Sequence, residues 1–217
     1  MISQIPKGLP KEILREIKVV ENNEPLVEIL ETDRVKLLKE HKFLSPFIRK
    51  SVLDLLYKAG DNLPDGYQLL IVTALRTVSM QQKLWDQRIW QMTKEYPLLR
   101  IFNNKEFYRR VRLYTAPPGG SPHHCGSAID LTVIKPDGQR LDMGASLTDF
   151  GEKVHMHSGL ITEEQKKNRA LLREVMTKEG FVYYPLEWWH YCYGDSMWAA
   201  YTNKKECFYG PVELADK

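Results

Sequence analysis

The chain has 217 residues, of which 43% are hydrophobic and 27% charged, so it can bury a full hydrophobic core within one domain. Its net charge is only +3, and its Lys and Arg residues are interleaved with Glu, which argues against nucleic acid as a partner. No apolar run reaches the length of a membrane span, and the N-terminus lacks the apolar core of a signal peptide. We therefore expect a single domain over residues 1–217, cytoplasmic as given, or periplasmic if a leader has been removed.

Hydrophobic periodicity and turn residues predict short strands alternating with helices. About residues 1–40 are expected to form an irregular segment that wraps the domain. In chain order, the patterns predict a strand at 25–30, a helix at 45–57 with Ser45 as its N-cap, a turn at 61–66, a buried strand at 67–75, helices at 79–94 and 104–111, and a loop at 116–121.

The second half of the chain continues in the same way. It predicts a strand at 126–134, a hairpin turn at 136–139 leading into 140–143, a helix from a capping box at 162–165 to Gly180, and short strands at 181–184 and 188–193. The predicted class is α+β, with a small, central, mainly antiparallel sheet flanked by helices.

Two candidate ligand residues, His123 and Asp130, lie in the motif Ser121-Pro-His-His-Cys-Gly-Ser-Ala-Ile-Asp130. Because alternate residues of a strand face the same side, Asp130 can point at a site while Ile129 enters the core. A carboxylate buried in such an apolar strand needs a cation or a metal as partner. A buried arginine is the alternative partner for Asp130.

The third candidate ligand is His190, which ends the motif Glu187-Trp-Trp-His190. His123, Asp130 and His190 would leave the fourth tetrahedral position of Zn²⁺ open for water, as in catalytic zinc sites. We therefore predict one zinc ion per chain. Glu187 is predicted to accept a proton from that water as a general base, provided that the bend at Pro185 turns it toward the metal.

Other residues offer rival or supporting roles. Cys125 lies inside the first motif and a thiolate binds zinc well, although its place in a glycine-containing turn favours another direction. The pair His155 and His157 is a rival metal site or a support for the first one. Three cysteines, an odd number, are too few for a disulfide framework. Arg76 ends the buried strand near Gln81 and is suited to a developing oxyanion, with a surface salt bridge as the alternative.

These motifs resemble the zinc D-alanyl-D-alanine dipeptidases of the VanX type, which are related to zinc D,D-carboxypeptidases and the hedgehog-like fold. The resemblance covers about residues 20–195. It rests on Ser-x-His-x-x-Gly-x-Ala-x-Asp at 121–130, Glu-Trp-Trp-His-Tyr at 187–191, the Arg76 segment, Met143-Gly144, the Phe150 region and the helix before Gly180.

The resemblance implies roles for the site residues. His123, Asp130 and His190 bind zinc, Glu187 is base and acid, and Arg76 stabilises the transition state. Substrate contacts fall to Ser121, Asp149, Trp188 and Trp189, although the two tryptophans are equally well explained as core aromatics. The family places an acidic residue shortly after Met-Gly to bind the substrate's ammonium, whereas a gapless register here gives Thr148, followed by Asp149.

The expected activity is hydrolysis of D-alanyl-D-alanine or a similar short D-amino-acid dipeptide, with zinc as cofactor. A D,D-carboxypeptidase or a peptidase acting on peptidoglycan stem peptides is the enzymatic alternative. A non-catalytic, zinc-stabilised binding domain is the alternative of another class. Neither a nucleic-acid partner nor a membrane span is expected, and the sequence carries no signal for the oligomeric state.

Overall fold

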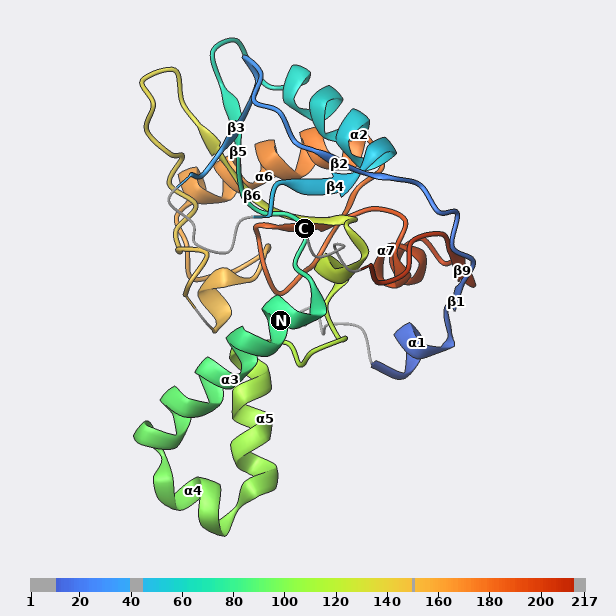
Figure 1. Ribbon diagram of the computed structural model, residues 1–217. Coiled ribbons are helices and arrows are strands. Elements are labelled where there is room, and N and C mark those ends of the chain that lie inside the picture. The colour runs from blue at the N-terminus through green and yellow to red at the C-terminus, as the bar shows by residue number, and fades with distance from the viewer. Residues whose placement is uncertain (1–10, 40–44, 150, 213–217) are drawn as a thin grey trace.

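The computed structural model describes residues 11–39, 45–149 and 151–212, so residues 1–10 of the predicted wrapping segment and Phe150 lie outside the described part. A five-stranded sheet lies at its centre (Figure 1). Its strands, in spatial order, are β3 (Val35–Leu37), β5 (Gln68–Thr73), β6 (Ala128–Ile134), β8 (His190–Cys192) and β7 (Val182–Tyr183). Within this sheet, β3 and β5 are parallel and the other neighbours are antiparallel, which confirms the predicted class.

The main core lies between one face of this sheet and two helices, α2 (Lys50–Asp61) and α6 (Glu163–Lys178), which contact each other. The sheet contributes alternate, fully buried residues to it, namely Leu69 and Ile71 of β5, Ile129, Leu131 and Val133 of β6, and Tyr191 of β8. Because strand residues alternate between faces, the residues between them, Asp130 and His190 included, face the other side.

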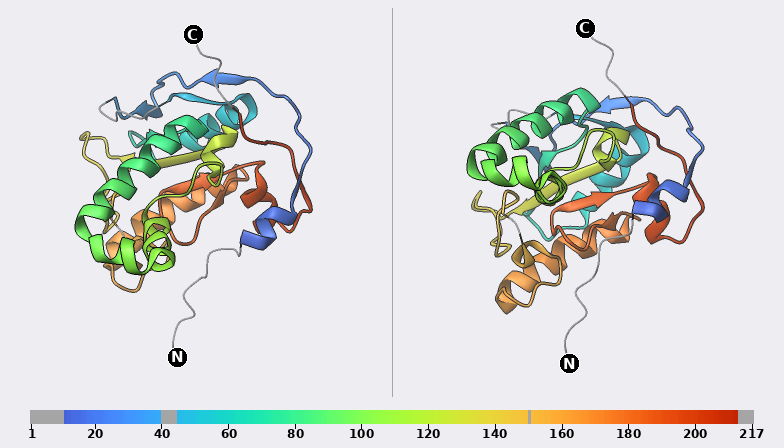
Figure 2. Two further views of the ribbon diagram at one scale, coloured as in Figure 1. Left: turned by 60° about the horizontal axis from the view of Figure 1, so that its bottom comes forward. Right: turned by 90° about the horizontal axis from the view of Figure 1, so that it is seen from below.

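A helical arm, residues 78–114, follows β5 and projects from the body of the molecule (Figures 1 and 2). It consists of α3 (Val78–Glu95), α4 (Pro97–Phe102) and α5 (Asn104–Tyr114). The arm has its own small core, in which Trp85 and Met92 of α3 meet Phe107 and Val111 of α5. The sequence predicted α3 and α5 and missed α4.

The N-terminal segment pairs with distant parts of the chain. After α1 (Lys11–Glu16), strand β1 (Lys18–Val19) runs parallel to β9 (Glu206–Cys207) near the C-terminus. Strand β2 (Leu26–Glu28) then pairs antiparallel with β4 (Phe47–Arg49). The remaining described elements are η1 (Pro122–Cys125), η2 (Glu152–Val154) and α7 (Ser196–Tyr201), which contacts α1.

Local signals were right at some helix ends and wrong at others. The capping box of α6 is present, with Thr162 and Gln165 capping each other. The helix predicted from Ser45 begins instead at Lys50, because residues 47–49 pair with β2 and extend the chain. The predicted strand at 140–143 is reduced to a bridge between Ile134 and Arg140. No helix among the described residues has the length and apolar character needed to cross a bilayer.

Candidate metal centre

The loop that carries His123 is fixed to the end of β5 by hydrogen bonds. Arg76 donates its backbone N–H to the carbonyl of His123 at 3.1 Å, and His123 Nδ1 donates to the carbonyl of Ala74 at 2.7 Å. His124 Nδ1 donates to the carbonyl of Arg76 at 2.5 Å, while its Nε2 accepts from Gly119 N–H at 3.2 Å. With Nδ1 of His123 protonated, its Nε2 carries the free lone pair that a metal ligand needs.

Strand register brings the other two candidates together. Asp130 of β6 is the direct cross-strand partner of His190 of β8, so both side chains leave the same face of the sheet. Asp130 Oδ1 lies 3.0 Å from His190 Nδ1, and Oδ2 lies 3.2 Å from His123 Nε2. The predicted triad therefore meets at one place.

The triad fits a zinc ion. All three residues are buried, and their donor atoms lie within 4.8 Å of one another. Two ligand atoms bonded at ~2.1 Å to a tetrahedral ion stand about 3.4 Å apart, close to the nitrogen–oxygen separations found here. Among the described residues this is the group of His, Cys, Asp and Glu with metal-site spacing.

The pKa shifts at the site have two causes, burial and the pairing of Asp130 with the two histidines. Burial lowers the pKa of His123, which favours the neutral imidazole. Burial alone would raise the pKa of Asp130, but the two histidines outweigh it and hold that pKa well below its usual range. Burial would likewise lower the pKa of His190, yet the hydrogen bond to Asp130 and its charge raise it overall. The site thus concentrates one fixed negative charge between two imidazoles.

Glu187 faces this cluster from the turn between β7 and β8. Two backbone hydrogen bonds shape the turn. The N–H of Glu187 donates to the carbonyl of Tyr184 at 3.1 Å, and the N–H of His190 donates to the carbonyl of Glu187 at 3.4 Å. Burial raises the pKa of Glu187; His190, Arg76 and a hydrogen bond from Trp189 lower that pKa in part, and the charge of Asp130 raises it further. The predicted bend therefore turns Glu187 and His190 to the same side.

Arg76 lies at the same site from the end of β5. Its Nη2 forms a long ion pair of 3.9 Å with Asp130 Oδ2, and both histidines lie closer to that carboxylate. Arg76 Nη1 donates to Gln81 Oε1 at 3.0 Å. Its Nε is buried and finds no hydrogen-bond partner among the described residues, which leaves one donor for another group.

Comparison with known proteins shows the family of this chain. Residues 48–210 match the family model described as D-ala-D-ala dipeptidase. The chain belongs to this family.

A D-alanyl-D-alanine dipeptidase of Synechocystis is 28% identical over 91% of this chain and 95% of its own length. The Escherichia coli D-alanyl-D-alanine dipeptidase is 42% identical over 33% of this chain and 37% of its own. The solved structure of the LdcB LD-carboxypeptidase shares the fold, with a TM-score of 0.50 and 21% identity over 85% of this chain and 81% of that one.

Family membership and the triad together make this dipeptidase-family chain a zinc metallopeptidase, as the motifs predicted. The rival metal groups do not form among the described residues. Cys125 is buried and burial raises the pKa of its thiol well above the usual range. His157 is exposed and bonds to Tyr183 through Nε2 at 3.1 Å, and His155 joins it in no metal-spaced cluster.

The predicted substrate contacts of the peptidase lie in different settings. Ser121 caps η1 and accepts the N–H of His123 at 3.4 Å. Trp188 and Trp189 are both buried in the main core; Trp188 has Arg169 5.7 Å from its ring, which favours a packing role, and Trp189 also lies beside Glu187. Asp149 is exposed and accepts the N–H of Ser146 at 2.7 Å.

The loop that carries Asp149 is held by a buried arginine that the sequence did not single out. Arg169 of α6 donates to the carbonyls of Met143, Lys153 and His155 at 2.6–2.9 Å, on both sides of that loop. Burial lowers the pKa of Arg169 to about 10. Three backbone carbonyls therefore satisfy the hydrogen-bond donors of this buried cation.

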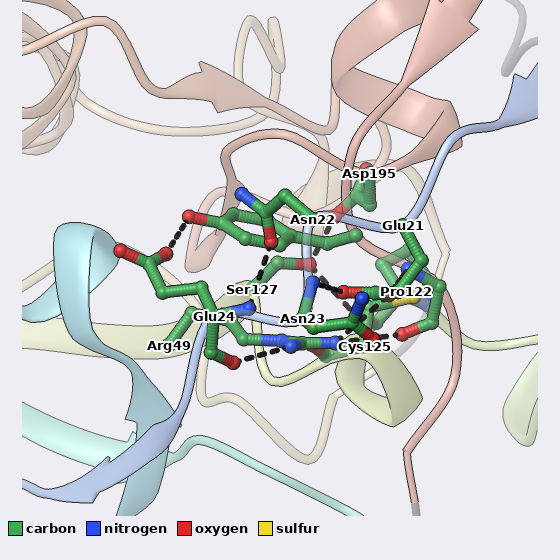
Figure 3. Close-up of polar contacts among 11 residues, drawn as sticks. Glu21, Asn22, Asn23, Glu24, Arg49, Pro122, Cys125, Ser127 and Asp195 are labelled. Carbon is green, nitrogen blue, oxygen red and sulfur yellow. Dashed lines mark hydrogen bonds and ion pairs between the residues drawn. The ribbon is translucent and has the colours of Figure 1, made fainter.

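A second buried arginine, Arg49, supports the loop that carries His123. Figure 3 shows Arg49 between Glu24 and Cys125. Its Nε donates to the Cys125 carbonyl at 3.0 Å, its Nη1 to the Glu24 carbonyl at 2.6 Å, and its Nη2 to Glu21 Oε2 at 3.1 Å. The loop ends at Gly126, whose φ of 64° would strain a residue with a side chain and where a Cβ would also displace Leu26. The N-terminal segment thus holds the loop that presents His123.

Proposed function

We propose that the protein hydrolyses D-alanyl-D-alanine or a similar short D-amino-acid dipeptide. The observation that carries this proposal is the meeting of Glu187 and Arg76 with the triad at one site. A structural zinc site needs neither a general base nor an arginine beside it. The substrate class follows from the family and from the named activity of the relatives in Synechocystis and Escherichia coli.

The residues divide the reaction among them. Zinc, when bound by the triad, polarises the scissile carbonyl and lowers the pKa of a water to about 7. Glu187 takes the proton of the attacking water and returns it to the departing amine. Arg76, with an unpartnered Nε–H at the site, donates to the carbonyl oxygen as negative charge develops on it. His123 and His190 stay deprotonated on the atoms that hold the metal.

The substrate ends would be held by residues around this centre. Trp189, beside Glu187, would limit access of bulk water, and Ser121 would contact the substrate at the start of the metal loop. Asp149 would pair with the substrate ammonium, although its carboxylate already accepts Ser146 N–H. Replacing Asp149 with Ala should raise KM for the free dipeptide and leave an N-acetylated dipeptide unaffected. Equal effects on both substrates would remove Asp149 from ammonium binding.

The proposal is tested by assaying the zinc-loaded protein on free D-Ala-D-Ala, L-Ala-L-Ala and a peptidoglycan stem pentapeptide, with and without chelator. Release of D-alanine from the free dipeptide, lost with chelator and restored by zinc, is the expected result. Preference for the pentapeptide would favour the D,D-carboxypeptidase or stem-peptide activity. No turnover of any peptide by a protein that retains zinc would favour the non-catalytic binding domain.

A further inference from the structure

The far end of the helical arm exposes a cluster of large apolar side chains. Leu98, Ile101 and Phe102 of α4 are 66%, 71% and 81% exposed. Their spacing of three and four residues places them on one face of the helix, while Leu99 packs inward on the arm's core. We call these three residues the apolar tip. Contiguous exposure of this kind marks an interaction site more often than chance.

The arm that carries the apolar tip is also the basic part of the molecule. Residues 78–114 contain eight Lys and Arg against three Asp and Glu, a net charge of +5. The whole chain carries 31 basic and 28 acidic residues, so the rest has a net charge of −2. The positive charge that appeared scattered along the sequence is therefore concentrated on one projecting element (Figure 1).

The arm also exposes an aromatic side chain beside a lysine. Trp90 of α3 is 59% exposed, and the Nζ of Lys94 stands 3.7 Å from its ring centre. Trp90, Lys94 and Arg100 line one hollow of the arm together with one acidic residue, Asp86, and Arg100 belongs to α4. A tryptophan with basic neighbours beside aliphatic side chains is the composition that favours the boundary between lipid headgroups and acyl chains.

We propose that the arm binds an anionic lipid bilayer, with the apolar tip inserted among the acyl chains and the surrounding Lys and Arg residues on the headgroups. Charge complementarity favours this occupant, because a net charge of +5 on one element attracts an anionic surface. Size argues against a second protein. Helix α4 has six residues and forms the end of the arm, whereas a stable protein interface takes about 800 Å² from each partner. A bilayer needs no complementary groove.

The test uses the full chain with zinc and two kinds of vesicle, phosphatidylcholine alone and phosphatidylcholine with phosphatidylglycerol. Co-sedimentation should be strong only with the anionic vesicles and should weaken as salt is added. The triple variant L98S/I101S/F102S should bind the anionic vesicles at least about tenfold more weakly than the wild type, since it loses the inserted groups. The variant K94E/K105E, which changes two exposed cations of the arm, should also lose binding.

A matched control changes exposed leucines of the body instead. L30S/L160S removes side chains that are 64% and 58% exposed outside the arm, and should bind vesicles as the wild type does. Dipeptide hydrolysis in solution should be unchanged in the tip variant, which shows that it is folded.

Three results would overturn the proposal. They are absence of binding to anionic vesicles, equal binding by the tip variant and the wild type, and a dimer in solution that the tip variant converts to monomer without any vesicle binding. The second would indicate a general affinity for polyanions, and the third an interface between copies.

Discussion

Gln81 joins Arg76 to the loop that leads into the metal motif. Its Oε1 accepts from Arg76 Nη1 at 3.0 Å, and its Nε2 donates to the Ala116 carbonyl at 2.6 Å. The side chain is fully buried in the first turn of α3. Because both ends of its amide are used, Gln81 fixes the direction of the Arg76 guanidinium relative to the triad.

Replacing Gln81 with Leu should therefore lower kcat about 10- to 100-fold on the dipeptide, since a displaced arginine meets the developing charge poorly. Zinc content should not change. The neighbouring Gln82→Leu is the matched control, because Gln82 bonds to Asp86 on the exposed side of α3. Steady-state kinetics of both variants checks this prediction. Equal rates for the two would separate Gln81 from the position of Arg76.

Replacing Arg49 with Met should destabilise the fold and weaken metal binding together. The change leaves the buried carbonyls of Glu24 and Cys125 without their donor, and breaking such a buried cluster costs about 3–5 kcal/mol. Because Cys125 belongs to the loop of His123, zinc affinity should fall about 10-fold or more. Chemical unfolding and zinc titration measure the two effects.

The control for that prediction is Arg34→Met. Arg34 also bonds to carbonyls, of Pro64 and Tyr67, but lies at the surface away from the metal motif. Its loss should cost less stability and leave zinc affinity unchanged. A similar fall in zinc affinity for both variants would mean that Arg49 acts through general stability alone.

Asp142 should make stability depend on pH in the acid range. Its carboxylate accepts from Gln165 Nε2 and from Gly144 N–H, each at 2.8 Å, and these bonds lower its pKa. A carboxyl with a lowered pKa in the folded state stabilises above its unfolded pKa of about 3.9, and that contribution is lost as the pH falls through the folded pKa.

Asp142→Asn should accordingly destabilise at pH 7 by no more than about 1 kcal/mol, because the group is exposed. The difference from the wild type should shrink as the pH is lowered below 4. Urea unfolding of the zinc-free proteins at several pH values checks the sign. A difference that grows toward acid would contradict the account.

The sequence predicted those parts of the site that depend on local chemistry. His123 and Asp130 share one short motif, and a strand places Asp130 by its alternation alone. Arg76 was found because a strand ends there. By contrast, His124 hydrogen-bonds to Arg76 and Gly119, which only the folded chain brings near to it. Its role in joining two loops therefore had no signal in the sequence.

Long-range packing also decided what the sequence left open. Ser45-Pro46 carries a good helix-start signal, but Phe47–Arg49 pairs with β2 and delays the helix to Lys50. Trp188 and Trp189 are adjacent, chemically alike and both buried in the main core, so only their neighbours distinguish them, Arg169 for Trp188 and Glu187 for Trp189. Arg49 hydrogen-bonds to Glu21 near the N-terminus and to Gly210 near the C-terminus, and no local sequence pattern predicts these contacts.

The most direct test of the proposed mechanism is the dipeptidase activity of Glu187→Ala, measured with its zinc content. Glu187 faces the triad but is not one of its three donors, so the variant should keep one zinc per chain. Its kcat on D-Ala-D-Ala should fall by about 10² to 10⁴, the contribution of a general acid–base residue. Full zinc content with near-normal turnover would contradict the assignment of Glu187 and with it the proposed mechanism.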